Sequence, residues 1–293
     1  MLRLSRMRWI HGWLLFLPAA VLLFAFTHLP AAETLWASLH STLRGRRPAV
    51  FVGLDQYRTL LDDPIFWQVL WNNALFALGT IPASVALALA MALLVDSRIA
   101  GRAAARMAYF TPTILPLVAA ANIWLFFYTP SYGLLDQIGG LFGFGETNLL
   151  GSRETALPAL MVVTIWKEAG FFMIFYLAAL QQVPPTYREA AALEGAGRWT
   201  YFRRILFPLL MPTTLFVLVN AVINAFRMVD HVIAMTRGGP DNASALLLFY
   251  VYEVAFKFWD TGYASALTVV LLVILAVLAI GQFAYLDRRV HYR

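Results

Sequence analysis

Six apolar runs, each about 20 residues long, constrain the fold of this chain more than any other feature. As an α-helix, that length crosses a hydrocarbon core of roughly 30 Å. A membrane-spanning strand would need only about 10 residues of strict alternation, so a barrel is disfavoured. The sequence therefore predicts an all-α, polytopic membrane protein with a single transmembrane domain over 1–293. We place its six spans at about 9–29, 71–95, 107–128, 157–180, 209–235 and 264–285.

Composition excludes several kinds of site. Apolar residues make up 61% of the chain and charged residues 13%, against about 25% charged in a soluble domain. Cysteine is absent, which excludes disulfides and thiolate metal sites. The five histidines have no metal-ligand spacing, so we expect no metal site. They are His11, His28, His40, His231 and His291.

The chain has no phosphate-binding loop. Its lysines are Lys167 and Lys257, and neither lies in a glycine-rich G-x-x-x-x-G-K-[ST] motif. If ATP drives this protein, another chain must therefore bind it.

The first apolar run begins after three arginines and resembles a signal peptide. At about 20 residues it is longer than a usual signal core, and no clear A-x-A cleavage site follows. We interpret it as an uncleaved first span.

Charge asymmetry predicts the orientation. With the amino terminus inside, the inner segments 1–8, 96–107, 181–208 and 286–293 hold 13 arginines and four acids. The outer segments hold seven basic residues and ten acids. Because cytoplasmic loops carry the excess of basic residues, both termini are expected in the cytoplasm. The basic pI then reflects topology, and no aromatic-basic module supports a nucleic-acid partner.

A polar insert rich in small residues, at about 184–208, separates the fourth and fifth spans. Pro184-Pro185 ends the fourth span. Thr186 and Glu189 fit a capping box that begins a short helix. That helix is expected to stop near Gly195 or Gly197, which suit a left-handed C-cap. A second helical piece is predicted over Arg198–Phe207.

The order of residues in this insert resembles the EAA loop of the membrane subunits of binding-protein-dependent ABC importers. In that family the loop forms a coupling helix seated in a cleft of the ATP-binding subunit. Glu194 stands where an Asp is usual. The residues that carry the resemblance, and the coupling role it implies, are Glu189, Ala190, Ala191, Glu194, Gly195, Ala196, Phe202 and Pro208.

Other motifs are similar to the carbohydrate-uptake branch of the family, the maltose and glycerol-phosphate type. They are 51–57, Thr236-Arg237-Gly238-Gly239-Pro240 and 250–256. The branch usually has Gly where Arg237 stands. The resemblance implies a type I ABC importer permease fold in the bacterial inner membrane and a sugar, polyol or glycerol phosphate as solute.

The same resemblance implies the partners. They are a second permease chain, two ATPase subunits that bind ATP and Mg²⁺, and an external solute-binding protein. The outer segments 30–70, 129–156 and 236–262 would dock that protein, although simple connection is the alternative. No cofactor is expected on this chain.

Polar residues in the fifth span suggest a solute path. Asn220, Asn224, Arg227 and His231 fall on one helical face, and Asp230 can pair with Arg227. The alternative is hydrogen bonding between helices. Three positions that align with solute contacts in maltose-type relatives are apolar here. The full candidate set is Asn220, Ala221, Asn224, Ala225, Arg227, Met228 and Asp230.

Two further polar pairs have simpler interpretations. Lys167-Glu168, inside the fourth span, is expected to offset its own burial as an ion pair. Asn72-Asn73, at the start of the second span, is expected at the membrane interface.

Two other classes of function remain as alternatives. A secondary transporter needs acidic ion sites, yet only Glu168 and Asp230 are available and no inverted repeat is evident. A membrane enzyme needs a nucleophile–base or metal constellation, and none is evident. A non-enzymatic permease subunit is the preferred hypothesis.

Overall fold

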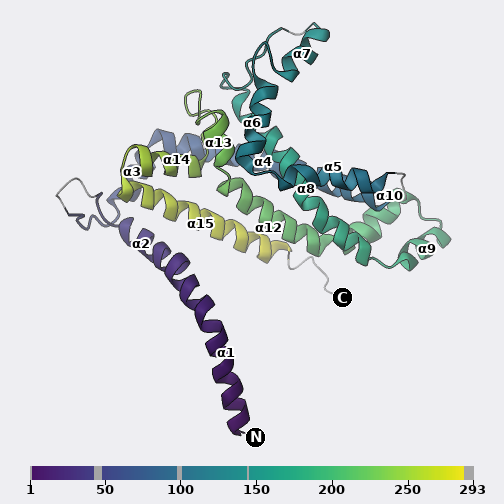
Figure 1. Ribbon diagram of the computed structural model, residues 1–293, viewed down its shortest axis with the longest axis horizontal. Coiled ribbons are helices and arrows are strands. Elements are labelled where there is room, and N and C mark those ends of the chain that lie inside the picture. Colours follow the sequence, from purple (N-terminus) through teal and green to yellow (C-terminus); the bar gives the residue numbers. More distant parts are fainter. Residues whose placement is uncertain (1, 43–47, 98–100, 144, 287–293) are drawn as a thin grey trace. The chain divides into compact units, whose positions relative to one another are not determined.

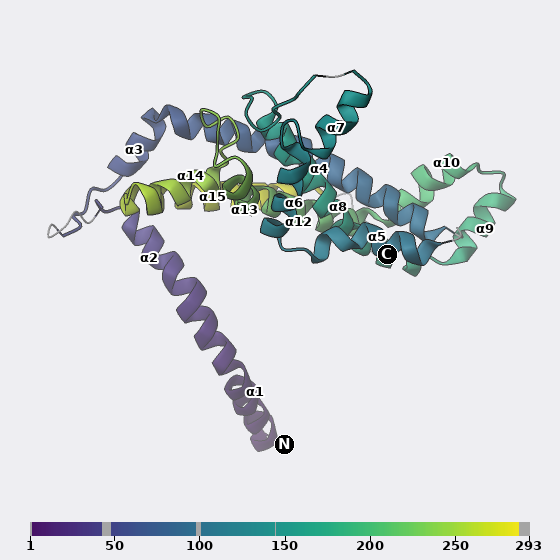
Figure 2. The ribbon, with the colours of Figure 1, turned by 45° about the horizontal axis from the view of Figure 1, so that its top comes forward.

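The computed structural model describes residues 2–42, 48–97, 101–143 and 145–286 (Figures 1 and 2), and side chains between 12 and 284 of those ranges. Among these residues no strand forms, and the one extended pairing is an isolated bridge between His40 and Phe51. The predicted all-α fold is therefore confirmed. Several arginines used to predict the orientation lie outside the described residues, namely Arg44, Arg46, Arg47, Arg98, Arg288, Arg289 and Arg293.

The chain divides into two compact units. One comprises Met1–Asp63 with Val251–Leu272, and the other Pro64–Tyr250 with Val273–Arg293.

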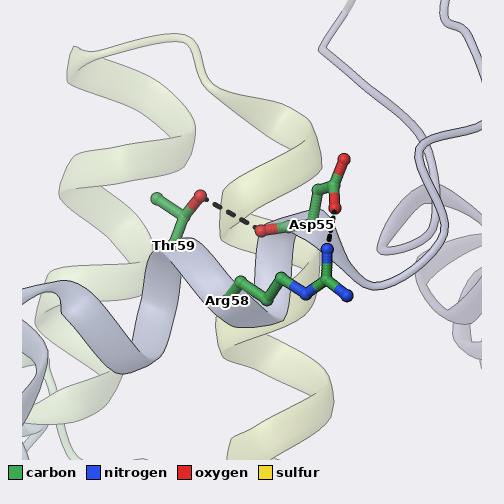
Figure 3. Close-up of polar contacts among 3 residues, drawn as sticks. All are labelled: Asp55, Arg58 and Thr59. Atoms are coloured by element: carbon green, nitrogen blue, oxygen red, sulfur yellow. Dashed lines mark hydrogen bonds and ion pairs between the residues drawn. The ribbon is translucent and has the colours of Figure 1, made fainter.

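The first unit contains a long apolar helix and, later in the chain, a short polar one. The apolar helix consists of α1 (Leu2–Leu23), the π-helical turn η1 (Phe24–His28) and α2 (Leu29–Ala37). At the start of α3 (Asp55–Asp62), Arg58 donates to the Asp55 carboxylate at 3.1 Å, and the Thr59 hydroxyl donates to the Asp55 carbonyl (Figure 3). Because this ion pair is exposed, it contributes little to stability.

The carboxy-terminal part of the first unit is tied to its amino-terminal part. It includes η3 (Glu253–Lys257) and the start of α15 (Thr261–Leu286). The Tyr263 hydroxyl donates to Asp63 at 2.7 Å, and the Gly262 amide donates to the Thr42 hydroxyl at 2.9 Å.

Helix α8 (Ala156–Gln182) forms the centre of the second unit. It packs against α4 (Pro64–Asp96), α5 (Arg102–Ile114) and α12 (Met211–Arg227). Its apolar side chains are buried among those of α4 and α12, which accounts for the core. Helices α5 and α8 approach closely at Gly170, where a Cβ atom would lie 2.2 Å from the Tyr109 carbonyl oxygen.

Within the described ranges, five helical stretches are long and apolar enough to cross a membrane: Gly12–Ala37, Pro64–Asp96, Ala156–Gln182, Met211–Met235 and Thr261–Ala284. The third predicted span is instead broken into α5 and α6 (Leu117–Tyr128), which are bent by 104°. Pro116 lacks an N–H, and the residue before a proline avoids the helical region. Accordingly Leu115 is extended, with ψ 135°. Counted as one broken span, this pair gives six candidate spans.

The remaining elements are short. They are α7 (Leu134–Leu141), α9 (Pro185–Leu193), α10 (Arg198–Tyr201), the π-helical turn η2 (Phe202–Leu206), α11 (Phe207–Leu209), α13 (Asp230–Met235) and α14 (Leu247–Tyr252). Both ribbon views show α9 and α10 extending past the end of α8 (Figures 1 and 2).

Candidate functional site

Helix α9 begins earlier than the sequence predicted. Pro184 is the N-cap and Pro185 the first helical residue, and no side chain caps the helix. The predicted capping box of Thr186 and Glu189 is therefore wrong. The fixed φ of proline and its missing N–H suit the first helical position, so the helix starts at Pro185 and places Thr186 inside it.

The end of α9 follows the predicted glycine geometry. Gly195 has φ +74°, and its amide donates to the Ala192 carbonyl at 3.1 Å. The Ala196 amide donates to the Ala191 carbonyl at 2.9 Å. These two bonds form a Schellman motif, which closes the helix on its own carbonyls. The predicted stop near Gly195 is confirmed.

The second helical piece contains a feature that the sequence did not predict. It runs through α10, η2 and α11, so its middle is a π-helical turn at Phe202–Leu206. The indole of Trp199 stacks on Phe202, with ring centroids 5.5 Å apart. Arg203 and Arg204 lie within the turn and are exposed.

Most side chains of α9 and α10 are exposed. In α9 only Ala191 is buried. Leu193 is 90% exposed and Trp199 is 70% exposed. Glu189 and Glu194 are exposed as well. Apolar and acidic side chains of this segment are therefore both accessible to another molecule.

A second cluster, polar and buried, lies where α4, α8 and α12 meet. The Glu168 carboxylate, in a residue only 8% exposed, accepts a hydrogen bond from Asn224 Nδ2 at 2.8 Å. Beside it is a cavity of about 10 Å³, which is room for one water molecule at most. The cavity is lined by Thr80, Ile81, Ser84, Thr164, Glu168, Phe172, Ala221, Asn224, Ala225 and Met228.

The predicted pathway residues do not all meet at this cavity. Ala221, Asn224, Ala225 and Met228 line it. The Asn220 amide donates to the Phe216 carbonyl of its own helix. Arg227 and Asp230 are exposed, and the ion pairs of the described side chains do not join them.

The predicted continuous face from Asn220 to His231 is wrong. Helix α12 ends at Arg227, and Met228 is extended with ψ 116°. His231 therefore belongs to α13. It is fully buried beside Phe76, with its Nε2 3.5 Å from the Thr164 hydroxyl.

Lys167 and Glu168 do not form the predicted ion pair. Lys167 Nζ donates to backbone carbonyls in the last turn of α5 and to that of Leu115, which follows the helix, whereas Glu168 faces Asn224. Consecutive residues on a helix point in directions about 100° apart, so each finds a different partner.

Asn72 and Asn73 are buried, at 7% and 0% exposure, instead of lying at the beginning of a span. Helix α4 starts seven residues before the predicted span, at Pro64, which places both asparagines in its interior. Asn72 Nδ2 donates to the carbonyls of Asn242 and Ala245. These bonds hold the loop after α13, in which Arg237, Gly238, Asp241 and Asn242 all have positive φ.

In the described ranges, no three His, Asp or Glu side chains are grouped to hold a metal ion.

Comparison with known proteins identifies the family. Residues 66–292 match the model of the binding-protein-dependent transport system inner membrane component. The chain belongs to this family. It is a permease component of the inner membrane and not an enzyme, which decides against both alternative classes.

Curated relatives of this permease agree. It is 34% identical to the sulfoquinovosyl glycerol transport system permease protein of Agrobacterium fabrum, over 88% of this chain and 84% of that one. It is 31% identical to the trehalose/maltose transport system permease protein of Thermococcus litoralis, covering 93% and 94%. It is also 31% identical to the sn-glycerol-3-phosphate transport system permease protein of Escherichia coli, covering 98% and 97%.

The fold is that of an ABC importer permease. The chain superposes on a bacterial alginate ABC transporter in complex with an alginate pentasaccharide-bound periplasmic protein, with a TM-score of 0.87. The sequences are 22% identical, and the match covers 98% of this chain and 97% of that one.

Proposed function

We propose that this permease forms half of the membrane pathway of an ATP-driven importer and receives force through the 184–208 segment. Residues 1–293 would form one transmembrane domain with both termini in the cytoplasm. A second permease chain would complete the pathway, two ATPase subunits would bind ATP and Mg²⁺, and a solute-binding protein would deliver the solute from outside.

The exposure of α9 carries this proposal. Leu193 projects from a helix that contributes only Ala191 to the core. The Schellman motif closes the helix on its own carbonyls and so fixes the carboxy-terminal end that carries Leu193. An ATPase cleft that buries Leu193 would gain about 1.5–3 kcal/mol from that side chain.

Co-purification tests the coupling surface. Leu193→Asp is expected to reduce the amount of ATPase subunit that purifies with the permease about 10-fold or more, because it places a charge in the apolar contact. Leu141→Asp is the matched control, since Leu141 in α7 is 84% exposed. Equal recovery of the ATPase with Leu193→Asp and with the unaltered chain would refute the proposal.

For the solute, we propose a hydroxyl-rich molecule such as a sugar, a polyol or a glycerol phosphate. The three relatives described above are permeases for solutes of this kind. The path would pass the cavity wall formed by Ala221, Asn224, Ala225 and Met228. In this conformation the cavity has a volume of about 10 Å³. Asn220, Arg227 and Asp230 do not line that cavity and would lie along the parts of the path that lead to it.

Solute competition tests the path. Ala225→Asn and Met228→Asn each add a hydrogen-bonding group to the wall, so they are expected to alter the relative uptake of competing sugars and polyols. Unchanged relative uptake in both variants would argue against this wall as the path.

A further inference from the structure

The break in the third span leaves backbone carbonyls without helical partners. In a continuous helix the amide of residue 116 would bond to the Pro112 carbonyl, but Pro116 has no N–H. The 104° bend between α5 and α6 also separates the next amides from the carbonyls of the last turn of α5. Buried carbonyls of this kind need other donors.

Lys167 supplies those donors from α8. Its Nζ lies 3.2 Å from the Pro112 carbonyl oxygen, 3.4 Å from that of Thr113 and 2.5 Å from that of Leu115. An ammonium group has three N–H donors, one for each carbonyl. Its charge also faces the negative end of the α5 dipole.

The next residue, Glu168, forms a hydrogen bond with the other interrupted span, which consists of α12 and α13. Its carboxylate accepts from Asn224 Nδ2 at 2.8 Å. The Asn224 carbonyl in turn accepts from the Met228 amide at 3.0 Å, the bond that closes α12 before its interruption.

The two segments beyond the breaks also meet. Helix α6 packs against α13. The ends of both broken spans are therefore held by two consecutive residues of α8, and the segments that follow them contact each other.

We propose that Lys167 and Glu168 are positioning residues that tie both interrupted spans to α8, so that the two breaks change shape together. Lys167 sets the bend between α5 and α6, and Glu168 sets the end of α12. The contacts of Lys167 and Glu168 that carry this proposal all lie within this chain. The consequence of this proposal for transport rests on the proposed function.

A distance measurement tests the role of Lys167. Because the chain has no cysteine, spin labels can be introduced at Met107→Cys and Phe126→Cys, on exposed positions of α5 and α6. In the full chain in lipid nanodiscs, Lys167→Met is expected to broaden the distance distribution between the labels. Lys167→Arg should restore the narrow distribution, because it retains charged N–H donors. Lys257→Met, at the other lysine, should leave it unchanged.

The same labels test whether the two breaks are coupled. Glu168→Leu removes the acceptor of Asn224, whereas Glu168→Gln keeps an oxygen in its place. Coupling predicts that Glu168→Leu broadens the α5–α6 distribution and that Glu168→Gln does not. Uptake should fall about 10-fold or more in Lys167→Met and Glu168→Leu, with normal co-purification of partners.

Unchanged label distances in both Lys167→Met and Glu168→Leu would overturn this inference. The label distances are measured without transport. Their failure to change is therefore distinct from failure of the coupling surface, which is detected by co-purification of the ATPase with Leu193→Asp. Broadening in Lys167→Met alone would overturn the coupling of the two breaks.

Discussion

The backbone amide of Leu247 donates to Oδ1 of Asn73 at 3.0 Å, joining residues 174 positions apart in the chain. Asn73 Nδ2 also lies 3.4 Å from the Ala225 carbonyl oxygen. The fully buried side-chain amide of Asn73 thus provides a hydrogen-bond partner for a backbone N–H at the start of α14 and for a carbonyl near the end of α12.

Replacing Asn73 should destabilise this permease. Asn73→Leu leaves the Leu247 amide and the Ala225 carbonyl buried without partners, which costs about 1–3 kcal/mol for each group. The melting temperature of the purified protein should fall clearly. Asn122→Leu is the control, because Asn122 is exposed and donates to the Val118 carbonyl of its own helix. An equal shift in both variants would contradict the role of Asn73.

The stability cost of a substitution at Gly195 should depend on how well the new residue adopts a positive φ, and not on its side-chain volume. A Cβ atom there meets nothing within 4 Å, but φ is +74°. Gly195→Asn should therefore be tolerated best, Gly195→Ala should cost about 1 kcal/mol, and Gly195→Val should cost more. ATP-dependent uptake at matched expression should decrease in the same order. Uptake that tracks side-chain size, with Asn worse than Ala, would refute this explanation.

Gly170 and Gly281 should respond to alanine in opposite directions. At Gly170 the new Cβ would lie 2.2 Å from the Tyr109 carbonyl oxygen, so α5 and α8 must separate, at a cost of about 1–3 kcal/mol. At Gly281 nothing lies within 4 Å, and alanine should gain up to about 1 kcal/mol of helix propensity. Thermal unfolding of the two variants checks both signs. Stabilisation by Gly170→Ala would exclude the close helix contact.

The loop that follows α6 should lose structure in strong acid. Hydrogen bonds from the Thr147 hydroxyl and the Ser131 amide hold the pKa of Asp136 below its ordinary value. Because the folded pKa is the lower one, the carboxylate stabilises the loop above about pH 4. That contribution is lost as the pH falls through the lowered pKa.

Limited proteolysis of the loop around Asp136 checks this dependence. Near neutral pH, Asp136→Asn should be cleaved faster than the unaltered chain. At a pH below the lowered pKa of Asp136, with an acid-active protease, the two rates should converge. Equal rates near neutral pH would contradict the role assigned to Asp136.

Local sequence rules predicted the features that depend on neighbouring residues. Apolar length located the candidate spans, and Gly195 located the end of α9, because both follow from the chain's own backbone. The capping box failed for a local reason as well, since Pro185 competes with Thr186 for the start of the helix. Pro116 offered a signal for the broken third span that the hydropathy pattern concealed.

The sequence by itself determined that this chain is a helical membrane protein and which segment lies between its fourth and fifth spans. Only the tertiary structure decided the partners of its buried polar groups. Lys167 binds the end of α5, Glu168 binds Asn224, and Asn73 binds Leu247. The physical reason is that a buried polar atom must find a partner wherever packing brings one near, and packing joins residues far apart in the sequence.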